Sequence, residues 1–301
     1  MSDQKPALIL NISPPKCGTT SIYSWLTKSE SVRSSRLKEP RFFSRGDVSQ
    51  FGQLPSGLEA RGNFDYGWSW FENNSFGAGR YHIDFTTYYA LLSDVPELVR
   101  AHFPDPKLIC ILREPVNRFV SHYYQYVKMG IEVPSLDETI SSDGDFSKFM
   151  VNFSKYGPNM RRYTDVFGAD SLLTIDFRDV VAQPEHVCHR LENFLNIEGV
   201  ATDDSSKAIN PSGRPIFGSL QKLLFSPKVR QHLRKVSPQM KTRLLGARKA
   251  VIRMNTSEEK YPALSSSQRI LLEERLADSI QFYAEIFGSR TPVNLTARSA
   301  K

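Results

Sequence analysis

Residues 7–22 read ALILNISPPKCGTTSI, and this stretch decides the fold. The apolar run at residues 7–12 has the length of a buried strand in a parallel sheet, and it ends at Ser-Pro-Pro. Helical spacing begins at about Thr20, and three apolar side chains then share one face: Ile22, Trp25 and Leu26. Residues 13–19 therefore form a loop between a first strand and a first helix.

The rest of the chain alternates between strand-like and helix-like segments. Strands are predicted at residues 81–85, 107–112 and 172–176, of which KLICIL at 107–112 is the strongest core strand. Helices are predicted from Pro115 onward and at residues 96–102, 156–167, 184–195 and, as one long amphipathic helix, 265–287. Between them, residues 44–79 show little periodicity and are expected to form a long irregular excursion.

This alternation predicts an α/β fold. We expect one P-loop-like domain over residues 1–288, with a central parallel sheet of about five strands flanked by helices and a C-terminal helical extension. Residues 289–301 are expected to form a flexible tail. No segment approaches the ~18–20 continuous apolar residues of a membrane span, and the first apolar run is too short for a signal peptide.

Composition and cysteine usage fit an ordinary globular protein. Hydrophobic residues make up 40% of the 301 residues and charged residues 24%. The three cysteines, Cys17, Cys110 and Cys188, are far apart, which indicates reduced thiols in a cytoplasmic protein and gives no metal-ligand spacing. We expect each of them to pack as a small hydrophobic residue, and we expect no bound metal.

The net charge of +7 belongs to one part of the chain. No acidic residue lies between Asp204 and Glu258, whereas twelve of the 39 Lys and Arg residues do. Such a block is typical of solvated helix faces or of a surface that faces anions, a membrane surface included.

The loop at residues 14–21, PPKCGTTS, has the residue types of a phosphate site. Backbone N–H groups at a helix N-terminus converge on an anion, and Gly18 permits close approach of the backbone. Lys16 adds a mobile positive charge, and three residues add hydroxyl donors: Thr19, Thr20 and Ser21. The order of glycine and lysine differs from a Walker A loop. A plain strand–turn–helix needs no ligand, so the residues alone leave both interpretations open.

The segment PPKCGTTSI resembles the 5′-phosphosulfate loop of sulfotransferases that use 3′-phosphoadenosine-5′-phosphosulfate (PAPS), whose pattern is roughly PK-x-G-T-T-x-L. The resemblance implies that Lys16 contacts the bridging oxygen of the donor. It also assigns the grip on the 5′-phosphate to the residues that follow: Cys17, Gly18, Thr19, Thr20 and Ser21. Sulfuryl transfer leaves negative charge on the departing 3′,5′-ADP, which a positioned cation and backbone donors stabilise without Mg²⁺.

A second motif follows the strand KLICIL. Arg113, Asn117 and Ser121 are four residues apart and are predicted to form one stripe at the carboxyl ends of the parallel strands. Residues 112–121 resemble the family's 3′-phosphate pattern, L-R-[DN]-P-x-x-R-x-x-S, which assigns that phosphate to Arg113 and Ser121. Glu114 departs from the pattern. The alternative, that Arg113 and Arg118 are surface cations, is weak because cations are disfavoured at a helix start unless an anion is there.

Residues 38–43, KEPRFF, resemble the KEPHFF segment of heparan-sulfate and related carbohydrate sulfotransferases, where the glutamate is the catalytic base. The resemblance assigns this role to Glu39, and Lys38 and Arg41 would keep it ionised if they lie close. Arg41 and Ser44 depart from the family's pattern. The alternative is that Glu39 is a salt-bridged surface residue.

Two reserve candidates for the base, His82 and Asp84, share one face of a predicted strand. The irregular excursion contains an aromatic cluster made of Tyr66, Trp68, Trp70 and Phe71. These rings could stack on a sugar or on adenine, but packing onto the core is the favoured interpretation. Two basic residues are candidates for closing over the 3′-phosphate, and the sequence does not choose between Arg214 and Lys260.

Together the motifs predict a sulfotransferase with PAPS as co-substrate and a carbohydrate hydroxyl as acceptor. A small natural product with a hydroxyl or amine is the alternative acceptor. A nucleotide kinase would need a Mg²⁺-binding carboxylate after the strand KLICIL, where Arg113 stands. A non-catalytic anion or nucleic-acid binder would work through the basic stretch, but no nucleic-acid motif supports it, and we expect no nucleic-acid partner.

Overall fold

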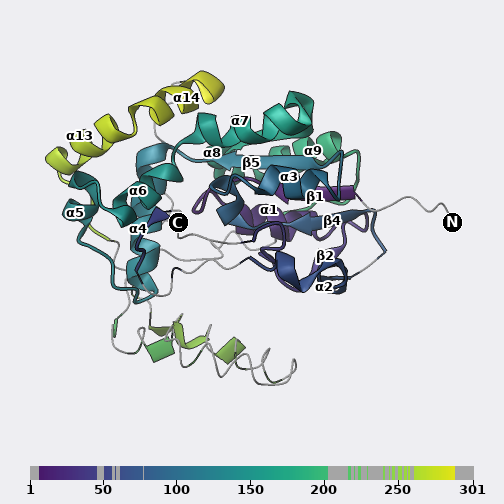
Figure 1. Ribbon diagram of the computed structural model, residues 1–301, viewed down its shortest axis with the longest axis horizontal. Coiled ribbons are helices and arrows are strands. Elements are labelled where there is room, and N and C mark those ends of the chain that lie inside the picture. The colour runs from purple at the N-terminus through teal and green to yellow at the C-terminus, as the bar shows by residue number, and fades with distance from the viewer. Residues whose placement is uncertain are drawn as a thin grey trace, which may run out of the picture.

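In the computed structural model, the described residues are 7–45, 51–55, 58, 62–76, 78–202 and 261–288, with scattered residues between 216 and 257 (Figure 1). Four strands form the central sheet in the order β4-β1-β5-β6, and every pairing is parallel. They are β1 (Ala7–Asn11), β4 (Tyr81–Asp84), β5 (Lys107–Leu112) and β6 (Leu172–Asp176). The α/β prediction is confirmed, with four strands in the described residues against the expected five.

The sheet is buried on both faces because its two central strands, β1 and β5, contain continuous apolar runs at residues 8–10 and 108–112. Ile9, Ile109 and Ile111 belong to one core cluster, whereas their neighbours, such as Leu8 and Leu108, belong to the opposite one. Successive side chains of a strand point to opposite faces, so a continuous apolar run supplies two cores.

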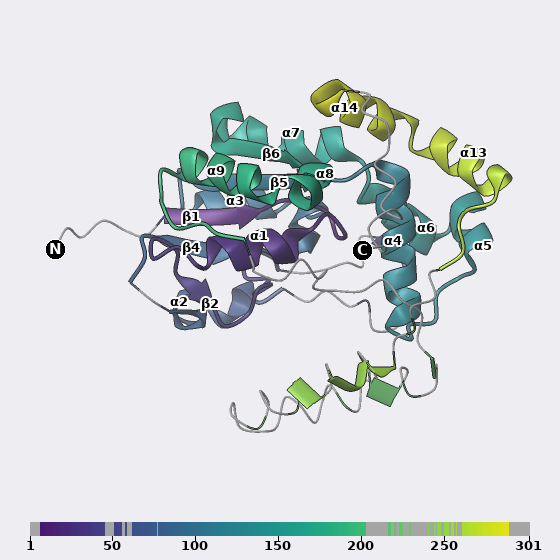
Figure 2. The same ribbon diagram turned by 180° about the vertical axis from the view of Figure 1, so that it is seen from behind.

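Helices cover both faces (Figures 1 and 2). One face is covered by α1 (Thr19–Leu26), α8 (Phe177–Ala182) and α9 (Pro184–Leu195). The other is covered by α2 (Trp68–Asn74), α3 (Val95–Arg100), α7 (Tyr156–Phe167) and part of α14 (Ala277–Phe287). Short 3₁₀ turns also occur, at Phe64–Tyr66, Thr87–Ala90 and Ala169–Ser171.

A third cluster, made of helices, lies beyond the end of the sheet where β5 runs into α4 (Figure 1). It contains α4 (Pro115–Lys128), α5 (Leu136–Ser141), α6 (Asp145–Asn152) and α13 (Ser266–Arg275). This is the carboxyl edge of the sheet, where open α/β proteins bind their ligands.

Two sequence predictions are wrong in detail. Residues 265–287 are two helices that meet at Leu276, because Leu272 packs into the helical cluster and Tyr283 into a core cluster of the sheet. The excursion at 44–79 is not irregular throughout, since α2 lies within it and β3 (Ser75–Phe76) pairs with β2 (Ser34–Ser35) in a small antiparallel sheet. Only Phe71 of this seven-residue helix is fully buried, and α2 is too short to show a helical period in the sequence.

The three cysteines are free and buried, as predicted. Among the described helices, none combines the length and the apolar character that crossing a membrane requires. The predicted tail at 289–301 lies outside the described residues.

Candidate functional site

The loop after β1 is held at the carboxyl edge of the sheet by hydrogen bonds to its neighbours. The Ser13 hydroxyl accepts from the Ile111 backbone N–H at 2.7 Å, which joins the loop to β5. Asn11 Oδ1 accepts from the Ser13 backbone N–H at 3.2 Å, and Asn11 Nδ2 donates to the Thr86 carbonyl at 3.3 Å. The end of β1 and the loop after it are therefore tied to β5 and to the segment that follows β4.

The loop backbone adopts a conformation that its own residues do not favour. Lys16 has a φ of 73°, in the left-handed region that costs a residue with a side chain about 1–2 kcal/mol. Gly18 has a φ of 87°, and a Cβ there would lie 2.9 Å from the Phe177 ring. This explains why glycine stands at that position. Such strain is typical of functional loops.

The N-terminus of α1 is open to an anion. No described side chain caps the helix, and its first turn contains no acidic residue. Lys16 and Arg113 lie beside it, and the Arg113 guanidinium donates to the Lys16 carbonyl at 3.3 Å and lies 4.9 Å from the centre of the Phe177 ring. Neither cation forms an ion pair with a carboxylate in the described part of the chain.

Arg113 also affects the protonation of Lys16. Burial, the nearby Arg113 and Lys128 lower the pKa of Lys16 to about 8, and burial lowers the pKa of Arg113. Partly buried cations without a counter-charge are costly in the ligand-free protein, and a bound anion would remove that cost. The geometry is thus compatible with a phosphate-type anion, and the binding of such an anion here stays a prediction.

Arg118 is not a surface cation, so that alternative is wrong for this residue. Its side chain is completely buried and donates to Ser154 Oγ at 2.9 Å and to the Met150 carbonyl at 3.0 Å. Its third contact is with His122 Nδ1 at 3.1 Å, and burial holds the pKa of His122 well below its usual range, so the neutral ring accepts. Arg118 therefore fastens α4 to the end of α6.

The second motif begins with a helix cap. The Glu114 carboxylate accepts from the backbone N–H groups of Val116 and Asn117, at 2.9 and 2.8 Å. This departure from the family's pattern keeps the capping function. Arg113 stands at the end of β5, and Ser121 lies two turns along α4, partly buried. Their role toward a 3′-phosphate stays a prediction.

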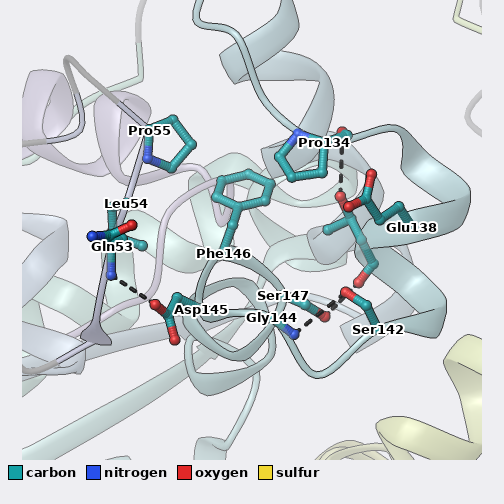
Figure 3. A pocket seen from close by; sticks show the side chains of 11 residues that line it. Gln53, Leu54, Pro55, Pro134, Glu138, Ser142, Gly144, Asp145, Phe146 and Ser147 are labelled. Atoms are coloured by element: carbon teal, nitrogen blue, oxygen red, sulfur yellow. Dashed lines mark hydrogen bonds between the residues drawn. The ribbon is translucent and has the colours of Figure 1, made fainter.

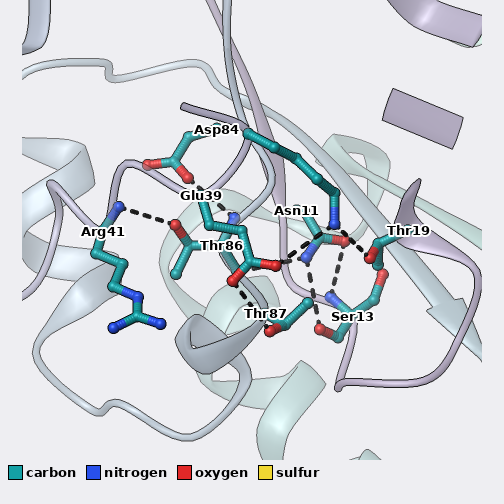
Figure 4. Close-up of polar contacts among 9 residues, drawn as sticks. Asn11, Ser13, Thr19, Glu39, Arg41, Asp84, Thr86 and Thr87 are labelled. Carbon is teal, nitrogen blue, oxygen red and sulfur yellow. Dashed lines mark hydrogen bonds and ion pairs between the residues drawn. The ribbon is translucent and has the colours of Figure 1, made fainter. Parts of the chain in front are cut away.

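Glu39 lies beside the loop, although twenty residues separate it from Thr19 (Figure 4). Lys38 Nζ donates to Thr19 Oγ1 at 2.9 Å and is 3.4 Å from Glu39 Oε1. The Thr87 hydroxyl is 3.5 Å from the other oxygen of Glu39. The Arg41 guanidinium, in contrast, lies over the Tyr88 ring, at 5.3 Å from its centre. Of these two cations, Lys38 therefore pairs with Glu39 and Arg41 does not.

Asp84 anchors the segment that carries Glu39. Its Oδ1 accepts from the Thr86 backbone N–H at 3.0 Å, and its Oδ2 accepts from the Tyr89 hydroxyl at 2.7 Å. Tyr89 in turn accepts from the Phe43 backbone N–H at 2.9 Å, and Thr86 Oγ1 accepts from that of Arg41 at 3.0 Å. Burial raises the pKa of Asp84 to about 7. Both of its oxygens hold this segment in place.

His82, the other reserve candidate, is buried among aromatic rings. Its Nδ1 is 2.9 Å from Ser75 Oγ, and burial lowers its pKa to about 4. The aromatic residues of the excursion pack mainly onto the core, as favoured, with Phe71 buried, Trp68 and Trp70 partly buried and Tyr66 67% exposed.

Sequence reasoning missed several residues of this site: Asn11, Ser13, Thr86, Thr87 and Phe177. The first four are polar and end or follow a strand at the carboxyl edge of the sheet. That position was the signal in the sequence that could have identified them. Two predicted residues, Arg214 and Lys260, lie outside the described residues, as does most of the basic stretch.

A cavity of about 400 Å³ lies elsewhere, between residues 53–55 and the helices α5 and α6 (Figure 3). Asp145 in its wall accepts from the Gln53 backbone N–H at 2.7 Å. None of the residues of the phosphate-type loop, nor Arg113 or Glu39, lines it. It is separate from the candidate site.

Fold and site define a class: a parallel α/β protein whose first strand–helix loop has an uncapped helix N-terminus and two partly buried cations beside it. The sulfotransferase domain profile matches residues 6–209. That is well over half of the chain, and the chain belongs to the PAPS-dependent sulfotransferase family.

Curated relatives are distant. Human heparan sulfate glucosamine 3-O-sulfotransferase 3B1 is 22% identical over 209 residues, covering 67% of this chain and 49% of its own length. Human heparan sulfate glucosamine 3-O-sulfotransferase 6 is 25% identical over 239 residues, covering 76% and 64%. This chain thus spans about half the length of the first of these relatives and under two thirds of the second.

A solved structure shares the fold. The sulfotransferase from Alicyclobacillus acidocaldarius superposes with a TM-score of 0.57 at 19% identity, covering 88% of this chain and 99% of its own. At this identity the likeness shows the fold alone.

The Asp84 anchor gives a prediction for stability. A carboxyl whose pKa is raised from 3.8 to about 7 by folding binds its proton more tightly in the folded state. Wild type should therefore lose stability relative to Asp84→Asn as the pH rises from about 4 to about 7. Urea unfolding of both proteins across this range measures the difference.

Tyr89→Phe is the matched control for this prediction. It removes the hydroxyl that stabilises the Asp84 carboxylate, so the pH window of the effect should move upward. A constant difference between wild type and Asp84→Asn from pH 4 to 8 would contradict a raised pKa at Asp84.

Proposed function

We propose that this protein is a sulfotransferase that transfers a sulfuryl group from PAPS to a carbohydrate hydroxyl. One observation carries the proposal: Glu39 lies beside Thr19 of the loop after β1 (Figure 4). The cations Lys16 and Arg113 belong to the same loop and to the adjoining end of β5. A base and an anion site side by side are what transfer from an anionic donor requires.

The donor end is formed by the two motifs. Lys16 and residues 17–21 would hold the 5′-phosphosulfate, and Arg113 and Ser121 the 3′-phosphate. PAPS supplies an activated sulfuryl group and a phosphate leaving group. The uncapped N-terminus of α1 and the cations without described carboxylate partners fit its negative charges.

In the proposed reaction Glu39 accepts the proton of the acceptor hydroxyl as the new oxygen–sulfur bond forms. Lys16 balances the charge on the bridging oxygen, which keeps the electron pair when the old sulfur–oxygen bond breaks. Asp84, through Thr86 and Tyr89, fixes the segment on which Glu39 stands. With the base misplaced, sulfuryl transfer would be slow even when the donor is bound.

Carboxylates at the strand ends already form hydrogen bonds or ion pairs within the protein, which argues against a kinase. Glu114, the first carboxylate after β5, caps α4 with both oxygens. Asp176 at the end of β6 pairs with Arg178 and accepts from the Tyr283 hydroxyl at 2.8 Å. Phosphoryl transfer would need such a carboxylate for Mg²⁺.

The acceptor proposal rests on the KEPRFF segment and on the activity for which the heparan sulfate relatives are named. A small molecule with a hydroxyl or amine is the second candidate. Arg41 favours it, because this residue replaces the histidine of the resembling segment and its guanidinium lies over Tyr88. The surroundings of the base thus differ from that pattern.

A binding experiment tests the donor site. Calorimetric titration of 3′,5′-ADP should show tight binding to wild type and a loss of at least about a hundredfold in Lys16→Ala/Arg113→Ala, since two charge-assisted contacts disappear. ATP and 5′-AMP, which lack the 3′-phosphate, are the control ligands. If the wild-type protein binds ATP but not 3′,5′-ADP, the sulfotransferase proposal is wrong and the kinase alternative takes its place.

Glu39→Gln tests the base. We expect kcat for ³⁵S transfer from labelled PAPS to a panel of heparan-type oligosaccharides and small phenols and amines to fall about 10²–10⁴-fold. The Kd for 3′,5′-ADP should not change. Glu30→Gln, at an exposed glutamate, is the matched control. An unchanged kcat in Glu39→Gln would remove Glu39 from the mechanism and leave the donor site standing.

The lowered pKa of Lys16 predicts how donor binding depends on pH. A bound anion needs the protonated amine, so affinity for 3′,5′-ADP should fall as the pH rises through about 8, by up to about tenfold per unit. Lys16→Arg keeps its charge throughout and should flatten the profile. Equal pH profiles for the two proteins would show that Lys16 does not contact the ligand.

A further inference from the structure

Lys38 bridges the two halves of the site. Its Nζ donates to Thr19 Oγ1, on the first residue of α1, at 2.9 Å and lies 3.4 Å from Glu39 Oε1. Thr19 is 4% exposed, so this contact holds the Lys38 amine beside the N-terminus of α1. No ion pair in the described part of the chain joins the Glu39 segment to the loop, so the link is this hydrogen bond.

This pair differs from an ordinary surface salt bridge. The side chains of Lys38 and Glu39 are 24% and 31% exposed, and burial lowers the pKa of Lys38 although the neighbouring Glu39 raises it. The second contact of the amine is a neutral hydroxyl that belongs to the donor loop. The positive charge is thus incompletely balanced and faces the place where the donor would bind.

The chemistry of the proposed function fixes where the sulfur must lie. In an in-line displacement, the acceptor oxygen, the sulfur and the leaving oxygen stand in a row. Glu39 defines the acceptor end of that row, and Lys16 and the N-terminus of α1 define the leaving end. A cation within hydrogen-bond reach of both ends lies beside the middle.

We propose that Lys38 is a further catalytic residue, whose Nζ binds the non-bridging oxygens of the sulfuryl group. The inference rests on the proposed function. As the acceptor oxygen bonds to sulfur, its proton moves to Glu39, and the electron pair of the breaking sulfur–oxygen bond stays with the phosphate. Protonation of Glu39 removes the partner that Lys38 has in the ligand-free protein. The contact with the sulfuryl oxygens forms when PAPS binds, and it strengthens during transfer because the competing carboxylate is then neutral.

Lys38 could instead act only on Glu39, by keeping the carboxylate in position. Donor affinity measured without acceptor distinguishes the two roles. A residue that only positions the base has no effect on donor affinity, whereas one that contacts the sulfuryl group discriminates PAPS from 3′,5′-ADP. These two ligands differ only by that group, so their affinity ratio isolates the contact.

The experiment is calorimetric titration of PAPS and of 3′,5′-ADP, without acceptor, into wild type, Lys38→Met, Lys38→Arg and the exposed-site control Lys148→Met. Lys38→Met keeps the length of the side chain and removes the charge. We expect it to weaken PAPS about 10–100-fold, as for the loss of a charged hydrogen bond, and to leave 3′,5′-ADP within about twofold. Lys38→Arg should recover part of the loss, and Lys148→Met should match wild type.

Binding of 3′,5′-ADP to Lys38→Met also shows that the variant is folded. Equal weakening of both ligands, or no weakening of either, would overturn the role of Lys38 while the sulfotransferase proposal stands. Failure of wild type to bind 3′,5′-ADP would instead overturn the proposed function.

Discussion

The hydrogen bond from the Ile111 N–H to the Ser13 hydroxyl is the contact on which the rest of the site depends. It joins the loop after β1 to the neighbouring central strand, so the backbone of the loop cannot relax away from the sheet. With this end fixed, the positive φ angles of Lys16 and Gly18 turn the chain into α1, and Phe177 closes the space behind Gly18. The helix N-terminus and the Lys16 amine then face the carboxyl edge, where Arg113 arrives from β5.

Charges at this edge are distributed unequally. The carboxylates at or just after strand ends, Asp84, Glu114 and Asp176, all serve the structure through hydrogen bonds or ion pairs. Lys16 and Arg113, in contrast, have no carboxylate partner among the described residues. This arrangement favours an anionic ligand, because the free energy lost by burying the two cations is recovered only when an anion binds.

Sequence reasoning located the strands, most helices and the phosphate-type loop because each has a local signal. A continuous apolar run predicts a buried strand, and residues such as Gly18 and Pro115 mark boundaries. The helix α2 was missed because it is too short to show a helical period. The bend at Leu276 was missed because distant contacts create it. The same holds for the buried Arg118, whose partners Met150 and Ser154 lie more than thirty residues away. Motif resemblance supplied Glu39, but not the contacts that position it.

Those contacts explain how two motifs with no sequence proximity can act together. The loop follows β1, and the KEPRFF segment is pinned to the end of β4, which pairs directly with β1 in register at Leu10 and Asp84. Asp84 therefore holds the segment of Glu39 at a fixed distance from the loop, since both stand on adjacent strands of a rigid sheet. Lys38 crosses the remaining gap to Thr19. In the proposed reaction, a change of acceptor would alter surrounding residues such as Arg41 and would leave unchanged the distance between the proposed base and the leaving group.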